Sequence, residues 1–331
     1  MLLALAAGCG TQAAPAETPA PVETAAPAET PAPEESEAPA VPETRTVVDM
    51  DGNEVTVPYE ITDCFNAYPV SNGIMTLLGV ESTQSYYLPR VSSGNWAWLR
   101  VFNPLINEKP QIGEDASVSA EELLTIAPQV VILSNAETAQ TYRDAGLNVF
   151  SVRAKTTDEF LEAVIKTGEL FGDEAKAKAE AWADYYRSNI ELVAERIKDI
   201  PDSDRPTVYY IGGKTPYNTS IKGNGIEFVT NGGGIFAAAD VLGDSREITA
   251  EQLLELDPDV IIVGTNNRAA GYEALMSDTA LAALSAVKDG AVYKTPQGTL
   301  PWDTYGPEQA MAVLWMAKTL YPDLFEDIDL K

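Results

Sequence analysis

The sequence predicts an α/β protein made of two Rossmann-like lobes, joined by a long backbone helix, with a ligand cleft between the lobes. Short runs of β-branched and aliphatic residues alternate with helical patterns, which indicates parallel sheets covered on both faces. One helix–proline–strand unit occurs twice, in residues 120–133 and 250–263, which indicates two lobes of similar build. An apolar stripe with helical spacing lies between the two copies and predicts the joining helix.

The first nine residues are predicted to be a targeting signal rather than part of the folded domain. Residues 1–8 are apolar or small and precede Cys9, so they resemble the end of a bacterial lipoprotein signal, in which the cysteine receives lipid. The basic residues that normally precede such a run are missing, so we expect the signal to be truncated. We therefore expect lipid anchoring through Cys9 on the outer side of the cell membrane, in a bacterium without an outer membrane.

Residues 10–45 predict a disordered tether rich in Ala, Pro, Glu and Thr. Its near-repeats, such as residues 15–19 and 27–31, contain almost no large apolar side chain, so nothing offsets the entropy of ordering. Proline and like charges keep such a segment extended. No later apolar run approaches the roughly 20 residues of a membrane-spanning helix, so the lipid is the expected contact with the membrane.

Charge and composition disfavour several classes of function. The net charge is −28, and such a surface argues against binding nucleic acid. The chain has no histidine, which excludes Ser-His-Asp triads, Cys-His pairs and His-ligated zinc or haem. Cys9 and Cys64 lie in different kinds of sequence, so no disulfide is expected between them. Cys64 is expected to be a small, buried apolar residue. The lack of histidine makes catalysis less expected, though enzymes without histidine exist, and we expect a protein that is not an enzyme.

The folded part divides into a first lobe (46–155), a helical connection (156–203) and a second lobe (204–331). Residues 45–58 alternate apolar and polar side chains around Asp51-Gly52, which predicts a β-hairpin. Buried strands are expected in four apolar runs. These runs are residues 130–133, 148–152, 207–211 and 260–263.

The helical connection predicts two helices in succession. Gly172 is expected to end the first, and Asp173 to cap the second. From there a single apolar stripe follows helical spacing to about residue 200, long enough to reach from one lobe to the other. The stripe consists of Trp182, Tyr186, Ile190, Val193 and Ile197.

The order of these motifs resembles one known family over about residues 45–331. The motifs are the two helix–proline–strand units, the helix between them, Asn231 with the three glycines that follow, and residues 286–293. Together they resemble the helical-backbone (class III) substrate-binding proteins of ABC transporters. That family binds iron-siderophore complexes, haem, corrinoids and, in one branch, molybdate or tungstate. The ending, residues 301–318, is similar to the metal and oxyanion branch.

The resemblance implies a partner and a role for two glutamates. Family members change little on ligand binding and dock on the permease through one glutamate at the tip of each lobe. We expect this chain to act as a monomer. Glu121 and Glu251 match those positions, each at the same distance before its proline, Pro128 or Pro258. Two carboxylates far apart would dock on arginines of the permease at two points. Alternatively, both are ordinary acids near a helix N-terminus, and the two roles are compatible.

Two considerations select candidate ligand-binding residues. Ligands of open α/β sheets lie beyond the carboxyl ends of strands, which points to Tyr68, Ser134-Asn135, residues 212–217 and residues 265–268. Residues 86–100 form an expected loop whose aromatic and cationic side chains can stack on and pair with a chelate. If residues 96–98 are extended, both indoles point to one side. The resulting candidates are Tyr68, Tyr86, Arg90, Trp96, Trp98, Arg100, Tyr217, Arg268 and Trp302.

The expected ligand is an iron(III) chelate, haem or a corrinoid, and no intrinsic cofactor is expected. A tyrosinate can ligate iron, or the chelate can supply every iron ligand itself. Molybdate or tungstate is the alternative, because glycine-rich turns such as residues 232–234 can offer backbone N–H groups. An enzyme on two α/β lobes is a weaker alternative, since no nucleophile elbow, P-loop or metal-ligand motif is visible. A surface adhesion module would leave the aromatic loop and the paired glutamates unexplained.

Overall fold

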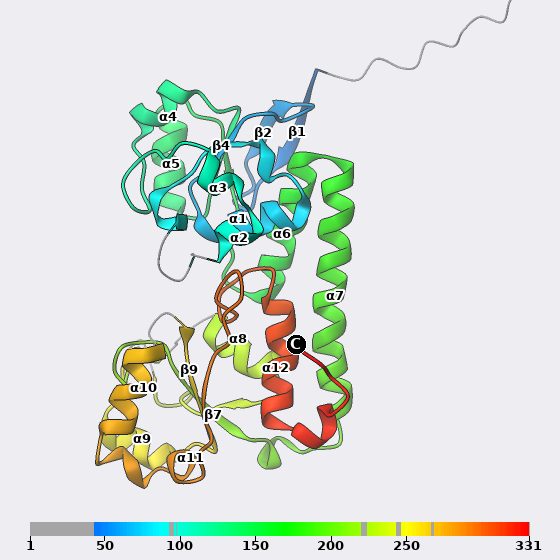
Figure 1. Cartoon of the computed structure of the whole chain (residues 1–331). Coiled ribbons are helices and arrows are strands. Elements are labelled where there is room, and N and C mark those ends of the chain that lie inside the picture. The colour runs from blue at the N-terminus through cyan, green and yellow to red at the C-terminus, as the bar shows by residue number, and fades with distance from the viewer. Residues whose placement is uncertain are drawn as a thin grey trace, which may run out of the picture. The chain divides into compact units, whose positions relative to one another are not determined.

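The computed structural model describes residues 43–92, 96, 98–219, 224–242, 246–265 and 268–330. Residues 41–331 form one compact unit, distinct from residues 1–40 (Figure 1). Cys9 and nearly all of the predicted tether lie outside the described residues. Among the described helices, none combines the length and apolar character needed to cross a membrane.

The described chain opens with the predicted β-hairpin. Strands β1 (Thr44–Val48) and β2 (Glu54–Pro58) pair antiparallel, with Val47 opposite Val55. The first strand begins at Thr44, one residue before the predicted end of the tether at residue 45. Asp49 organises the turn, because its Oδ1 accepts hydrogen bonds from the amides of Asp51 at 3.0 Å and Asn53 at 2.8 Å. Arg143 joins the hairpin to the rest of the lobe through a 2.6 Å ion pair with Asp49.

The first lobe holds a four-stranded sheet in the order β4-β3-β5-β6, and every pair is parallel. The strands are β3 (Cys64–Asn66), β4 (Gln84–Tyr86), β5 (Val130–Leu133) and β6 (Val149–Ser151). Both faces of β5 are buried: Val130 and Ile132 pack with the hairpin, and Val131 and Leu133 pack on the other side. The continuous apolar run therefore has the expected cause, a strand covered on both faces.

The second lobe repeats this topology. Its sheet has the order β10-β9-β7-β8 and is again parallel throughout. The strands are β7 (Thr207–Ile211), β8 (Ile235–Phe236), β9 (Val260–Val263) and β10 (Val292–Lys294). Numbered by their order in the chain, the strands of both sheets run second, first, third, fourth across the sheet. The prediction of two similar α/β lobes is confirmed.

Short helices connect the strands. Those of the first lobe are α1 (Pro69–Leu78), α2 (Leu99–Phe102), α3 (Leu105–Glu108), α4 (Ala120–Ile126), α5 (Ala136–Asp144) and the 3-10 helices η1 (Glu81–Thr83) and η2 (Pro89–Ser92). Those of the second lobe are α8 (Asn224–Asn231), α9 (Ala250–Leu256), α10 (Arg268–Ser277), α11 (Ser285–Lys288) and α12 (Gln309–Leu320), with 3-10 helices η4 (Asp202–Asp204), η6 (Leu281–Ala283) and η7 (Pro322–Phe325).

The repeated sequence unit folds alike in both lobes. Helices α4 and α9 each have seven residues and begin with a capping box, built on Ser119 in one lobe and Thr249 in the other. Each helix ends at a residue in the left-handed conformation, Ala127 with φ 47° and Asp257 with φ 34°. A proline and then a central strand follow, so the resemblance between the two sequences reflects a shared local structure.

Two helices connect the lobes, α6 (Thr157–Phe171) and α7 (Asp173–Ile197). The predicted stripe on α7 faces inward, and α7 contacts α1 of the first lobe and α12 of the second (Figure 1). The expected capping by Asp173 is wrong. Asp173 is the first residue of the helix, and Gly172, with φ 107°, occupies the capping position and supplies no side chain.

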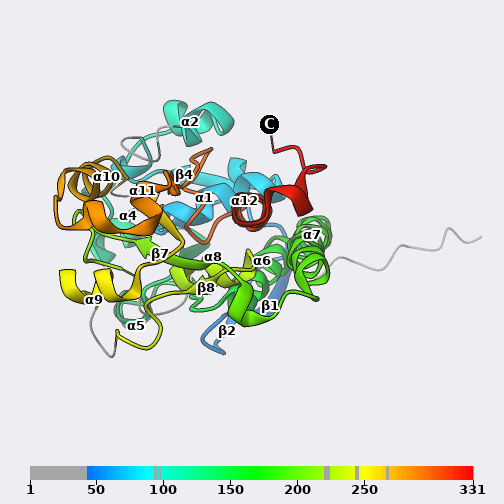
Figure 2. The ribbon, with the colours of Figure 1, turned by 90° about the horizontal axis from the view of Figure 1, so that it is seen from below.

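Hydrogen bonds attach α7 to the end of the second lobe. The indole Nε1 of Trp182 donates to the carbonyl of Pro307 at 3.1 Å, and Asn189 donates to the carbonyl of Ala310 at 2.7 Å. Seen from below, α6 and α7 lie together on the side of the molecule opposite α9 and α10 (Figure 2). Helices α6 and α7, which pack along one side of both lobes, therefore hold the two sheets in one unit.

Candidate functional site

A cavity of about 120 Å³ lies where the first lobe meets the second. Its lining includes Tyr68, Ser134 and Arg153, which follow strands β3, β5 and β6. Tyr305 of the second lobe and Phe160 of α6 complete it. The carboxyl ends of parallel strands meet at one edge of a sheet, so residues distant in sequence converge here.

Tyr305 connects the second lobe to this cavity. Its ring stacks on Phe160, with centroids 5.2 Å apart and an interplanar angle of 28°. Its hydroxyl lies 3.0 Å from the carbonyl of Lys155, to which it can donate, and 3.3 Å from Oε2 of Glu227. Burial, followed by the charge of Glu227, raises the pKa of Tyr305 above its ordinary value, so the phenol stays protonated at neutral pH.

Glu227, on α8, reaches across to the first turn of α6. Its Oε2 accepts hydrogen bonds from the amide of Thr157 at 2.5 Å and from the hydroxyl of the same residue at 2.6 Å. Asn231, also on α8, donates to the Thr157 hydroxyl at 3.1 Å. The positive end of a 15-residue helix is therefore occupied by a carboxylate of the protein itself.

Arg153 and Tyr68 supply polar groups from the first lobe. Arg153 donates through Nε and Nη2 to Oδ1 of Asp51, at 3.0 and 2.5 Å. This hydrogen bond raises the pKa of Arg153. Tyr68 precedes α1, and its amide donates to Asn66 at 2.9 Å. Burial raises the pKa of Tyr68 to about 12, so it presents a neutral hydroxyl.

A second cavity of about 180 Å³ lies between α1 and the segment that precedes α12. Phe102 and Leu77 line it from the first lobe, and Leu300 from the second. The approach is close at Gly73, where an added Cβ would lie 2.7 Å from Cδ1 of Leu300. Glu308 also lines this cavity, and its carboxylate accepts from the amides of residues 299 and 300 at 2.5 and 2.7 Å.

The segment expected as a loop, residues 86–100, is partly regular and partly buried in its described residues. Strand β4 ends at Tyr86, η2 and the start of α2 lie within the segment, and Tyr87, Val91 and Leu99 form a small core with Ile106. Leu88 packs instead with the core on one face of the sheet. Part of this segment is therefore apolar for a structural reason, because its buried residues anchor it to the lobe.

The extended conformation that would place both indoles on one side is not found at Trp98. Trp98 has helical angles, φ −71° and ψ −23°, and sits immediately before α2, so alternation does not apply to the two indoles. The Trp98 side chain is 57% exposed, and Trp96 is half-buried. Exposure of this size at a tryptophan leaves a large apolar surface open for a ligand.

The other candidates from the first lobe are scattered. Tyr86 is half-buried and packs against the core on one face of the sheet. Arg90 is exposed and lies 3.8 Å from Asp115 as an ion pair. Arg100 is a half-buried residue of α2. The structure therefore does not bring Arg90, Arg100 and Tyr68 together around the first cavity.

Three candidates belong to the second lobe. Tyr217 donates its hydroxyl to Asp278 at 2.6 Å, an internal contact. Trp302 is half-buried against the core, and its Nε1 is buried with no hydrogen-bond partner among the described residues. Arg268 begins α10, and its side chain lies outside the described residues.

Sequence reasoning thus pointed to Tyr68 and Ser134 among the residues that line the first cavity, and missed Arg153 and Tyr305. Arg153 follows the predicted strand 148–152, so the rule for carboxyl ends could have found it. No local signal marked Tyr305, because its place in the cavity depends on the contact between lobes.

The paired glutamates have matching surroundings. Glu121 and Glu251 are each the second residue of their helix, and both side chains are exposed. Helices α4 and α9 lie on the side of the molecule opposite α7 in both views (Figures 1 and 2). Both carboxylates are therefore accessible to a partner.

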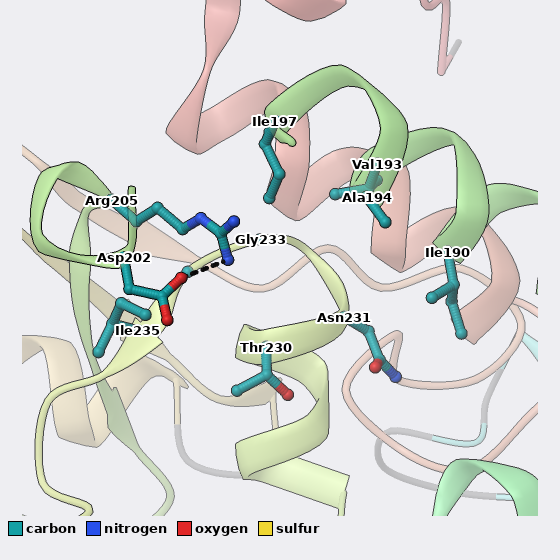
Figure 3. Close-up of a pocket in the computed structure, with 11 residues that line it drawn as sticks. Ile190, Val193, Ala194, Ile197, Asp202, Arg205, Thr230, Asn231, Gly233 and Ile235 are labelled. Carbon is teal, nitrogen blue, oxygen red and sulfur yellow. Dashed lines mark ion pairs between the residues drawn. The ribbon is translucent and has the colours of Figure 1, made fainter. Parts of the chain in front are cut away.

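A larger cavity, of about 330 Å³, lies beside the second half of α7 (Figure 3). Arg205 and Asp202 form a 3.0 Å ion pair at one end, and Ile190 and Asn231 also line it. Residues 233 and 234 of the glycine run line it too, but their amides already donate to the carbonyls of residues 230 and 229. These glycine amides are thus used within the chain.

Comparisons with known proteins agree with this architecture. A family model described as periplasmic binding protein matches residues 88–299, more than half of the chain. The molybdate-binding protein MolA of Haemophilus influenzae is 26% identical over 249 residues, covering 69% of this chain and 70% of that protein.

Two solved structures have the same fold. MolA bound to molybdate superposes with a TM-score of 0.71 at 23% identity, covering 86% of this chain and 94% of the other. CeuE of Helicobacter pylori with Ni(II) bound has a TM-score of 0.68 at 16% identity, covering 86% and 92%.

Proposed function

Because this chain belongs to the periplasmic binding protein family, we propose that it binds a metal chelate between its lobes and delivers it to an ABC importer. Proteins of this family are extracytoplasmic carriers that bind small ligands and work with a membrane permease. The finer assignment, a chelate such as an iron-siderophore complex, haem or a corrinoid, is our proposal for this chain.

The observation that carries the proposal is that aromatic side chains line both cavities between the lobes. Tyr68 and Tyr305 line the first cavity, Phe102 lines the second, and Trp98 is exposed beside α2. Aromatic faces hold the organic shell of a chelate by stacking and burial of apolar area. Each cavity is smaller than the roughly 300–1,000 Å³ of common ligand pockets, so a chelate would extend from them onto exposed aromatics such as Trp98.

Molybdate or tungstate is the second candidate, and a specific observation favours it. MolA, the relative at 26% identity, is named a molybdate-binding protein. A cavity of about 120 Å³ with the hydroxyl-bearing residues Tyr68, Ser134 and Tyr305 in its lining is large enough for a tetrahedral oxyanion. The carboxylate of Glu227, 3.3 Å from the Tyr305 hydroxyl, opposes a dianion, and for this reason we place the chelate first.

The proposal includes how the protein is held and where it docks. Cys9 carries the lipid anchor, and the residues between Cys9 and the compact unit that begins at residue 41 are the tether that separates this unit from the membrane. The folded unit acts as a monomer, and Glu121 and Glu251 dock on the permease, one from each lobe. The matched position and exposure of these two glutamates support this assignment.

The experiment that tests the proposal is native mass spectrometry of residues 41–331, the compact unit. The protein is mixed in turn with ferric siderophores, haem, corrinoids, molybdate and tungstate. A retained chelate mass supports the proposal. Retention of molybdate or tungstate alone selects the second candidate, and retention of no member of the panel contradicts both.

A further inference from the structure

We infer that the ligand of the cleft carries no net negative charge, so that it is a neutral or cationic chelate. This inference rests on the proposed function and narrows its ligand class. It derives from the placement of charges on the protein side of the two cavities between the lobes.

The first cavity has a carboxylate beside it, at a position where an anion would otherwise bind. The first turn of a helix offers unpaired N–H groups and a positive dipole end, and is therefore a common anion site. On α6 that site holds Glu227, which accepts two hydrogen bonds from Thr157. The same carboxylate oxygen lies 3.3 Å from the hydroxyl of Tyr305, which lines the cavity. An anion in the cavity would face this charge.

The second cavity repeats the arrangement with another acid. Glu308 lines it, and both oxygens of its carboxylate are used: one accepts the amide of Thr299, the other that of Leu300. Two adjacent backbone amides form an anion-binding concavity, and here it is already filled. Next to each of these two cavities, a carboxylate of the protein therefore already occupies backbone N–H groups that could otherwise bind an anionic ligand.

Little cationic charge offsets these acids. Among the described residues that line the first cavity, Arg153 is the one cation, and Asp51 holds it through two hydrogen bonds. Lys155 and Lys166 lie in an adjoining cavity, which Asp49, Glu159 and Glu162 also line. The cations that line these two cavities thus have acids nearby, so the local field does not favour an anion.

The test compares chelates of one shape and different charge. Ferrioxamine B carries a free ammonium group, its N-acetyl derivative is neutral at that position, and its N-succinyl derivative is anionic there. Haem and its dimethyl ester form a second pair, with and without propionate charges. Affinities are measured by calorimetry with residues 41–331. We expect the neutral or cationic member to bind at least tenfold more tightly than the anionic member of its series.

Variants test whether Glu227 produces this preference. Glu227→Gln keeps an oxygen for the Thr157 amide but removes the charge, so the anionic member should gain about tenfold in affinity while the neutral member changes less than twofold. Glu255→Gln, on an exposed side chain of α9, makes the same change in net charge and should leave both affinities within twofold. If Glu227→Gln does not fold, as judged by circular dichroism, Glu308→Gln replaces it for the second cavity.

The outcomes separate this inference from the proposed function. An anionic member that binds as tightly as its neutral partner overturns the inference and leaves a chelate carrier. An unchanged preference in Glu227→Gln and Glu308→Gln also overturns it, because the charges named here would then not set the ligand class. Binding of molybdate alone, or of no chelate, overturns the proposed function and the inference with it.

Discussion

Glu121 and Glu251 occupy the same position in two copies of one local structure. Each is the second residue of a seven-residue helix that begins with a capping box, and each helix leads into the central strand of its own sheet. Neither side chain is needed for the cap, since Glu122 and Gln252 complete the two capping boxes. An exposed carboxylate repeated at a position that the capping box does not require is a good candidate for contact with a partner.

Replacing both glutamates with alanine should abolish uptake while ligand affinity stays within about twofold. A hydrogen bond to a charged group contributes about 1.5–3 kcal/mol, so losing several contacts with the permease weakens docking strongly. Transport of a labelled ligand into cells and calorimetry of the purified protein measure the two effects. The control is Glu174→Ala with Glu191→Ala, on exposed positions of α7. Normal uptake by the Glu121/Glu251 double variant would exclude the docking role.

Cys9→Ala should release the protein from the membrane into the medium. Cys64→Ala is the matched control and should leave the protein in the membrane fraction, because Cys64 is buried. Burial also raises the pKa of the Cys64 thiol to about 12, which keeps it unreactive. Fractionation followed by immunoblotting distinguishes the variants. If Cys9→Ala remains in the membrane pellet, the lipid is attached elsewhere or absent.

Trp98→Ala should weaken ligand binding by about thirtyfold, since truncating an aromatic anchor typically costs at least about 2 kcal/mol. The free energy of unfolding should change by no more than about 0.5 kcal/mol, because the side chain is 57% exposed. Tyr185→Ala, at another exposed aromatic, on α7, is the control and should bind normally. Calorimetry and tryptophan fluorescence measure the effect. Unchanged affinity together with unchanged fluorescence would mean that Trp98 does not contact the ligand.

Gly73 and Leu300 should show non-additive effects on stability. A Cβ at position 73 would lie 2.7 Å from Cδ1 of Leu300, so Gly73→Ala forces the lobes apart or displaces the leucine. Leu300→Ala alone should cost about 2–5 kcal/mol, as for a buried leucine. The double variant should cost less than the sum by about 1 kcal/mol, because the new methyl group occupies space that Leu300 vacates. Urea unfolding measures all three variants, and strictly additive values would show that the two positions do not share this space.

Most of the elements predicted from local sequence patterns are present in the structure. The hairpin, the buried strands β5, β6, β7 and β9, and the long helix α7 were all expected from side-chain periodicity. Each of these patterns reflects a constraint within one element: a strand buried on both faces must be apolar throughout, and a helix buried on one face must repeat its apolar residues every three or four positions. The cap of α7 was missed because glycine can take the capping position through its backbone alone.

The sequence by itself determined two similar α/β lobes, the helix between them and the paired glutamates. Only the tertiary structure decided which side chains line the cleft. Tyr68 and Tyr305 share one cavity because the segment before α12 reaches the carboxyl end of the first sheet, and Glu227 lies near Tyr305 because α8 reaches the first turn of α6. Which side chains of segment 86–100 are buried was likewise decided by the tertiary structure, since burial of Tyr87 and Leu99 depends on neighbours that lie elsewhere in the lobe. Periodicity is a property of one element, whereas a cleft is formed by contacts among many.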